Sequence, residues 1–322
     1  MHFTPYLLDG HAAARHLAIE SLLLESDAGL GAFLLLYVNE PSVIVGRNQN
    51  PWREVAPDCM VPVYRRVSGG GAVFHDGGNL NWSLIVPRAQ HDQDAELLMM
   101  ANAISGCGVP IVPGERGGLY CAASSGHGGK KVSGTARRIG ATRALHHGTL
   151  LVSSDMQAMR RCLGGSGGID DRAVASVPAH VINLRDIRPE LDVYGMVGLL
   201  YGRVADSAPQ SLPEGIMPAD RLGEETARFA SSAWIYGTTP PFTHTVRSAC
   251  HTAAITVSQG VVRTIELDGQ TGSGTGEPID QPAKAPRPSL IGSAYSAELA
   301  NRVLQRLLEF DSVFYADKPV YW

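Results

Sequence analysis

Three consecutive glycines, Gly69–Gly71, follow directly on the run Arg65-Arg66-Val67-Ser68. Glycine loses more backbone entropy on folding than any other residue, so a folded chain keeps three in a row where the backbone must adopt a positive φ or approach another group closely. Bare N–H groups beside fixed guanidinium charge suit a bound phosphate or carboxylate. The pattern therefore predicts an anion-binding turn, and it leaves a flexible hairpin loop between two strands as the alternative.

The composition limits the class of protein. A chain of 322 residues with 44% apolar and 18% charged residues is expected to form a packed core, divided into one large and one small domain. The net charge of −4 argues against bulk attraction to nucleic acid or anionic membranes. The five cysteines are scattered and contain no C-x-x-C, which argues against a disulfide framework or a structural zinc site. Because no signal-like or membrane-spanning run is present, we expect a cytoplasmic protein.

Hydrophobic periodicity and turn residues predict the main elements. The helices are expected at residues 11–26, 94–104, 191–205, 221–232 and 296–309, and the strands at residues 31–37, 42–46, 80–86, 145–152, 253–258 and 261–267. A further strand is expected to begin at Lys131 and to belong to the same sheet as the strand at 145–152. The glycine-rich stretch 163–168 is a candidate lid, and the Gly/Pro-rich stretch 269–288 is expected to be a mobile loop.

The run from Arg65 to Asn79 resembles the signature of the lipoate–protein ligase family, in the biotin/lipoate protein ligase superfamily. Further segments resemble that family in the same order. They are Gly46–Glu54, Gly129–Ala136, Ala144–Val152, Ser176–Leu184 and Trp234–Phe242. The resemblance implies an α+β fold, with a large catalytic domain of mixed and antiparallel sheet over residues 1–243. It also implies a small α+β accessory domain over residues 244–322.

The resemblance also implies an activity. Such an enzyme uses ATP, with Mg²⁺ as counter-ion, to activate lipoate or octanoate as the acyl-adenylate. It then passes the acyl group to one lysine of a lipoyl carrier domain, such as a 2-oxoacid dehydrogenase E2 or a glycine-cleavage H protein. By register, Lys131 and not Lys130 is the family's essential lysine. An ammonium that reaches both the acyl carbonyl and the α-phosphate would offset the repulsion between two anions.

The predicted site follows from these matches residue by residue. Lys131 is the expected catalytic residue. The expected ATP and adenylate contacts are Arg66, Gly71, Ala72, Val73, Phe74, Asn79, Lys131 and Arg138, and the expected lipoate contacts are Arg66, Ser68, Gly69, Gly70, His75, Lys131 and His147. No protein metal site is expected, because His146 and His147 have no Asp, Glu or Cys grouping at ligand spacing.

The sequence departs from the family pattern at Arg116-Gly117-Gly118, where the family shows Gly-Arg-Asn-Asp. The resemblance places that aspartate near the nucleotide and its magnesium, so the departure leaves open how a metal would be held. Two alternatives remain: a cysteine-dependent octanoyl or lipoyl transferase using Cys121 or Cys162, and a non-catalytic protein that binds lipoate or the carrier.

Overall fold

The structure is a computed structural model that describes residues 2–205, 207–212, 217–249, 251–269 and 290–316. A five-stranded sheet forms its centre. Its order is β1-β2-β6-β11-β10, with β1 parallel to β2 and the other pairs antiparallel. The strands are β1 (Phe3–Leu7), β2 (Ala32–Tyr37), β6 (Asn79–Pro87), β10 (Thr135–Ile139) and β11 (Arg143–Leu151).

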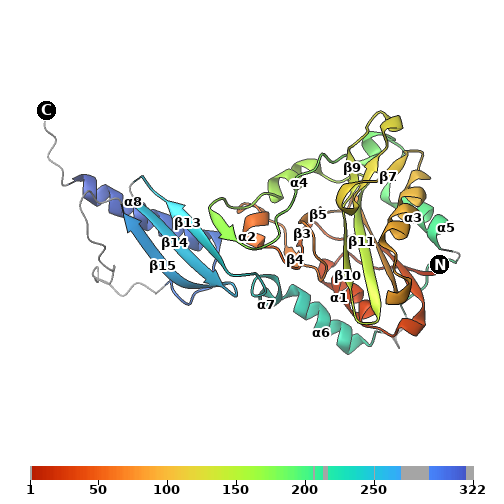
Figure 1. Ribbon diagram of the computed structural model, residues 1–322, viewed down its shortest axis with the longest axis horizontal. Coiled ribbons are helices and arrows are strands. Elements are labelled where there is room, and N and C mark those ends of the chain that lie inside the picture. Colours follow the sequence, from red (N-terminus) through yellow and green to blue (C-terminus); the bar gives the residue numbers. More distant parts are fainter. Residues whose placement is uncertain (1, 206, 213–216, 250, 270–289, 317–322) are drawn as a thin grey trace.

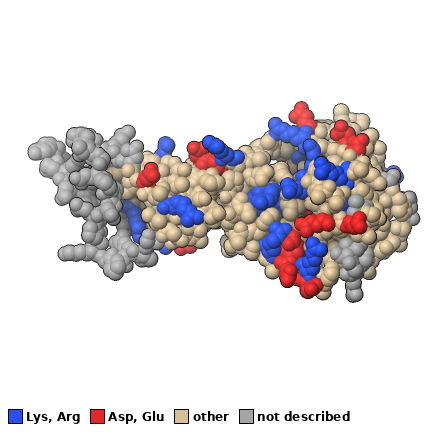
Figure 2. Space-filling view, turned by 60° about the horizontal axis from the view of Figure 1, so that its bottom comes forward, with Lys and Arg blue, Asp and Glu red and all other residues tan. Residues whose placement is uncertain are grey.

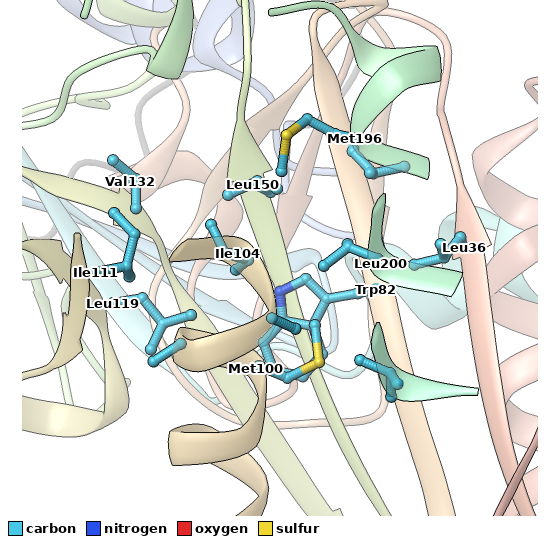
Figure 3. Close-up of a cluster of buried hydrophobic side chains, with 14 of the residues drawn as sticks. Leu36, Trp82, Met100, Ile104, Ile111, Leu119, Val132, Leu150, Met196 and Leu200 are labelled. Atoms are coloured by element: carbon cyan, nitrogen blue, oxygen red, sulfur yellow. The ribbon is translucent and has the colours of Figure 1, made fainter. Parts of the chain in front are cut away.

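Helices cover both faces of this sheet, which explains why every residue of β2 is buried. One face packs on α1 (Ala13–Leu24) through Phe33 and Leu35, and α1 in turn contacts α6 (Ala219–Ala230). The other face packs on α3 (Gln93–Ser105) and α5 (Val193–Val204) through Leu34 and Leu36. Successive side chains of β2 therefore point to opposite faces of the sheet, as expected for a β-strand. Figure 3 shows this second core, in which Trp82 lies among Leu36, Met100, Ile104 and Leu200.

Two small sheets flank the centre and carry the segments singled out above. The first has the order β4-β3-β5, from β3 (Ser42–Val45), β4 (Val63–Arg65) and β5 (Val73–His75). The second has the order β7-β8-β9, from β7 (Ile111–Pro113), β8 (Leu119–Cys121) and β9 (Lys131–Ser133). Short helices α2 (Pro51–Glu54) and α4 (Met156–Cys162) lie near the first of these sheets, and α2 begins with Pro51 directly after the N-cap Asn50.

A smaller unit lies at one end of the molecule (Figure 1). Its sheet has the order β12-β13-β14-β15, and α8 (Ala297–Ala316) packs against it. The strands are β12 (Ile169–Asp171), β13 (Phe242–Arg247), β14 (His251–Ser258) and β15 (Val261–Gly269), and α7 (Ser232–Ile235) directly precedes β13. The Trp52 ring of α2 makes an edge-to-face contact with Tyr295, with ring centroids 5.1 Å apart, so α2 and β12 both join the two parts. The division at residues 243 and 244 stays a prediction.

Most of the predicted helices and strands are confirmed to within a few residues, and two expectations about their arrangement are corrected. The strand that begins at Lys131 does not share a sheet with β11: β9 pairs with β8, and Gly134 separates it from β10, which pairs with β11. The glycine-rich stretch is held against α2, because the N–H groups of Gly164 and Gly165 donate to Glu54 O and Arg53 O. The predicted loop at 269–288 falls, apart from Gly269, outside the described residues.

The surface carries no broad region of one charge on the face seen in Figure 2, where Lys and Arg side chains alternate with Asp and Glu. In the described part of the chain, no helix combines the length and the apolar character needed to cross a bilayer.

Candidate active site

A cavity of about 470 Å³ lies where the central sheet meets the two small sheets. It is within the size range of small-molecule sites. Its lining comes mainly from α1, β2, β3, β5, β6, β9, β10 and β11. The glycine turn (Gly69–Gly71) and the segment 174–177 also contribute. The lining residues are Leu17, Tyr37, Ile44, Arg66, Gly70, Gly71, Ala72, Val73, His75, Asn81, Arg116, Lys131, Gly134, Thr135, Ala136, His147, Gly148, Thr149, Val174, Ala175, Ser176 and Val177.

The glycine turn forms one wall through close backbone contacts. Gly70 has φ +86°, and a Cβ at Gly46 would lie 2.2 Å from the Gly70 carbonyl oxygen, so both positions require glycine. Ser176 closes the turn from outside, because its hydroxyl accepts the N–H of Ala72 at 2.8 Å. The triple glycine is therefore a packed corner of the cavity, and the flexible-hairpin alternative is not supported.

Arg66 holds this corner from inside the protein. Its guanidinium donates to Ser68 Oγ at 3.0 Å, to Ile44 O at 3.1 Å, and to the carbonyls of Gly69 and Gly71. These bonds use four of the five N–H groups of a guanidinium. Burial lowers the pKa of Arg66 to about 10. Arg66 thus reaches the cavity as expected, but most of its hydrogen-bonding capacity fixes the turn.

A buried chain of hydrogen bonds links Arg66 through Ser68 and His147 to Glu20. Ser68 Oγ lies 2.6 Å from His147 Nε2, and His147 Nδ1 lies 2.9 Å from Glu20 Oε1. Both ring nitrogens of His147 are thus engaged, one by the Ser68 hydroxyl and the other by the Glu20 carboxylate. Burial raises the pKa of Glu20, but the charge of His147 and hydrogen bonds from His147, Ser83 and Tyr37 outweigh it and leave the pKa below its ordinary value.

His75 lines the cavity as a neutral imidazole. His16 Nδ1 lies 2.7 Å from Asn39 Oδ1, and Asn39 Nδ2 donates to His75 Nδ1 at 2.8 Å, which places the His75 proton on Nε2. Burial is the main cause that lowers the pKa of His75 to about 3, with Arg66 adding to it.

This low pKa predicts a pH dependence of stability. The unfolded chain binds a proton at His75 below its ordinary pKa of 6.5, whereas the folded protein binds it only near pH 3. Stability is therefore lost as pH falls from 6.5, by about 1.4 kcal/mol per pH unit for one proton. Denaturant unfolding across this range is expected to show that slope in the native protein and a slope smaller by that amount in His75→Asn. Equal slopes in the two proteins would contradict the assignment.

Lys131 lines the same cavity as Gly70 and Gly71 of the glycine corner. Its backbone is fixed by bonds to the segment 180–182, with Lys131 N donating to His180 O at 2.7 Å and Ile182 N donating to Lys131 O at 3.0 Å. Its ammonium lies 5.9 Å from the centre of the Tyr120 ring. Burial, and then the charge of Arg116, lower the pKa of Lys131. Within the described structure no carboxylate pairs with this ammonium, so its charge is available to a bound anion.

The other predicted site residues divide into two groups. Gly70, Gly71, Ala72, Val73 and His147 line the cavity with Arg66, His75 and Lys131. Outside the lining lie Ser68 and Gly69 in the corner itself, Phe74 in a hydrophobic cluster, Asn79, which donates to Asn81 at 3.0 Å, and Arg138, which is exposed on β10. Their roles toward a ligand stay predictions.

Sequence reasoning missed several parts of the cavity. Leu17 and Ile44 give it an apolar wall, and Val174–Val177 close it. Arg116 adds a positive charge, and its φ of +57° is unusual for a residue other than glycine. The helical period of residues 11–26 indicated a buried face but not which of its residues would reach a ligand.

The cysteines have other surroundings. Cys121 is buried in the core with Leu119 and Val132. Burial raises the pKa of the Cys121 thiol, and raises that of Cys162, together with Cys59, to about 12. A nucleophilic cysteine needs a lowered pKa and access to the substrate. Neither cysteine lines the cavity, so the structure gives the cysteine-dependent alternative no support.

Solved structures show the same fold. The structure matches that of Plasmodium falciparum LipL1 in complex with lipoate with a TM-score of 0.61 and 20% identity, covering 82% of this chain and 84% of that one. It matches a lipoate-protein ligase A bound with ATP with a TM-score of 0.61 and 22% identity, covering 73% of this chain and 98% of that one. The fold is thus the α+β fold of the biotin/lipoate ligases.

Sequence comparison identifies the family. Residues 12–198 match the model of the lipoyl protein ligase A/B catalytic domain, and the chain belongs to this family. It is 39% identical over 180 residues to a putative lipoate-protein ligase A of Schizosaccharomyces pombe, covering 54% of this chain and 48% of that protein. A Psychrobacter cryohalolentis lipoate-protein ligase A is 33% identical, with 67% and 66% covered. The mouse mitochondrial lipoyl amidotransferase LIPT1 is 34% identical, with 65% and 58% covered. The chain therefore spans about half to two thirds of these relatives.

Proposed function

We propose that this protein joins a lipoate-like medium-chain acid to a lysine of a lipoyl carrier domain, with the acid presented as its adenylate. The observation that carries the proposal is the placement of Lys131, without an acidic partner among the described residues, in one cavity with the glycine corner. Names of relatives in the family support a lipoyl substrate. Leu17 and Ile44 supply the apolar wall that an acyl chain needs.

The charges suit the transfer step. In an acyl-adenylate the carbonyl is joined to a phosphate that leaves as AMP. Attack by an amine places negative charge on the carbonyl oxygen and then on the departing phosphate. An ammonium fixed beside both groups in a partly dry site stabilises that charge more than water does. Lys131 would fill this role, and the N–H groups of the glycine corner would orient the phosphate from the opposite wall.

The resemblance implies that the chain also makes the adenylate from ATP, and the ATP-bound relative supports a nucleotide in this fold. Magnesium does not fit the residues present. Mg²⁺ prefers carboxylate and other oxygen ligands. Among the described residues, no Asp or Glu lines the cavity, and no group of three or more His, Cys, Asp or Glu could hold a metal ion. ATP-dependent activation is therefore an expectation from the resemblance that the residues of the cavity do not support.

The carrier and the domains complete the proposal. A lipoyl domain of an E2 subunit or an H protein would present its lysine at the mouth of the cavity. Residues 1–243 would form the catalytic domain and residues 244–322 the accessory domain, joined through α2 and β12.

The test is the mass of a purified lipoyl domain after incubation with the protein and synthetic lipoyl-AMP. We expect a gain of one lipoyl group, confined to the carrier lysine and absent when that lysine is replaced by arginine. Binding of lipoyl-AMP without any change in carrier mass would support the non-catalytic alternative and reject the proposal.

A further inference from the structure

The cavity has an unusual balance of charge for a site that would handle ATP. Among the described residues, the charged side chains of its lining are Arg66, Arg116 and Lys131, and none is acidic. Activation of the acid would bring together about four negative charges from ATP and one from the carboxylate, which enzymes of phosphoryl chemistry manage with protein-held magnesium. An acyl-adenylate carries about one negative charge. The cavity has three cations, and most of the hydrogen bonds of Arg66 go to the glycine corner. This charge matches an acyl-adenylate better than it matches ATP together with a carboxylate.

Two buried carboxylates that contact lining residues, Glu20 and Glu54, are committed elsewhere. Glu20 accepts bonds from Tyr37, Ser83 and His147. Glu54 accepts the N–H of Ser176 at 3.2 Å. Neither lines the cavity, and turning either carboxylate toward a metal would leave buried donors unpaired, which is costly.

The space next to Gly118, where a side chain would lie beside Lys131, is occupied by other side chains. A Cβ at Gly118 would lie 2.9 Å from Lys131 Cε and 2.7 Å from Tyr120 Cε2, so a side chain at this position would displace the lysine stem or the ring. Gly118 thus belongs to the packing that holds Lys131 in the cavity. A carboxylate at this position would require the lysine stem or the Tyr120 ring to shift.

Arg116 is held in the cavity wall instead. It adopts φ +57°, and the following residue Gly117 adopts φ +73°. The hydroxyl of Thr135 donates to Gly117 O and anchors this turn to β10. A non-glycine residue keeps a left-handed backbone only where its surroundings impose it, and such residues gather at ligand sites. The turn therefore presents a guanidinium on the same side of the cavity as Lys131.

From these observations we infer that the protein takes its acyl group from a preformed acyl-adenylate and does not activate the free acid with ATP. The inference rests on the proposed function and names its donor. In the step, the carrier amine forms a C–N bond to the acyl carbon and the C–O bond to the phosphate breaks. AMP leaves with the electron pair, and the surplus proton of the amine passes to the departing phosphate. A separate acid-activating reaction must supply the adenylate.

The test compares two donors with the same full-length protein and the same lipoyl domain. One reaction contains synthetic lipoyl-AMP, and the other contains lipoate, ATP and Mg²⁺. We expect lipoylation from lipoyl-AMP, and a rate at least about a hundredfold lower from ATP, with pyrophosphate release reduced to the same degree. Comparable rates, or lipoylation from ATP alone, would overturn the inference while the transfer function stands. No lipoylation from either donor would overturn the proposed function, and the inference with it.

Binding gives a second readout that does not depend on turnover. Calorimetry is expected to show that Mg²⁺ leaves the affinity for ATP unchanged within about twofold, since no protein carboxylate receives the ion. A tightening of ATP binding by about tenfold or more on addition of Mg²⁺ would contradict the inference.

Arg116 provides the residue-level test. Arg116→Gln is expected to raise the KM for lipoyl-AMP about tenfold with little change in kcat, because the guanidinium would bind the phosphate equally in the ground state and the transition state. The control is Arg137→Gln, which removes an exposed arginine on β10 outside the cavity. If Arg116→Gln and Arg137→Gln have the same KM, Arg116 is not a phosphate ligand and the charge argument fails.

Discussion

Lys131→Ala is expected to reduce carrier lipoylation from lipoyl-AMP about a thousandfold, the loss typical of removing one group that stabilises charge in the transition state. The ammonium forms no ion pair with a described carboxylate, so its removal costs the native structure little. We expect the unfolding free energy to change by less than about 1 kcal/mol. Mass spectrometry of the carrier measures the activity, and denaturant unfolding measures the stability.

Lys130 is the matched control. It is the preceding residue, carries the same charge, is exposed and does not line the cavity. Lys130→Ala should therefore retain the native rate. A folded Lys131→Ala protein with full activity would remove the central assignment of the site. Equal losses in both variants would point to a general effect of charge on the encounter with the carrier.

Arg65→Met is expected to lower the unfolding free energy by at least about 3 kcal/mol. Arg65 is fully buried, and burial lowers its pKa to about 10. Its guanidinium donates to the carbonyls of Gly46, Arg47, Gln49 and Ile235 and to the Thr239 hydroxyl. Methionine fills much of the space but satisfies none of these acceptors. Denaturant unfolding followed by far-UV circular dichroism would measure the loss.

Arg188→Met serves as the surface counterpart. Arg188 is largely exposed and pairs with Glu190, and an exposed pair of this kind contributes about 1 kcal/mol or less. A loss in Arg65→Met no larger than in Arg188→Met would show that water or neighbouring donors replace the buried guanidinium. Arg65 joins the turn after β3 to residues 235 and 239, so we also expect Arg65→Met to expose the α7 region to proteolysis first.

The adjacent arginines show where prediction from the sequence ended. The signature grouped Arg65 and Arg66 as one cationic pair before an anion-binding turn. In the structure they point to opposite sides of the backbone, as successive residues of an extended segment do. Arg66 faces the cavity, whereas Arg65 faces Ile235, 170 residues later in the chain. Nothing in the local sequence distinguishes the partner of one from the partner of the other.

The sequence by itself predicted most of the helices and strands and the glycine corner, because periodicity and glycine geometry act over a few residues. Its resemblance to the family implied the α+β class and the choice of Lys131. Only the tertiary structure decided that Glu20 supports His147, that Arg116 enters the cavity and that no acidic side chain of the described residues lines it. These depend on contacts between segments far apart in the chain, such as the 127 residues between Glu20 and His147. Such contacts are set by the packing of the whole sheet and its covering helices, and no local pattern encodes them.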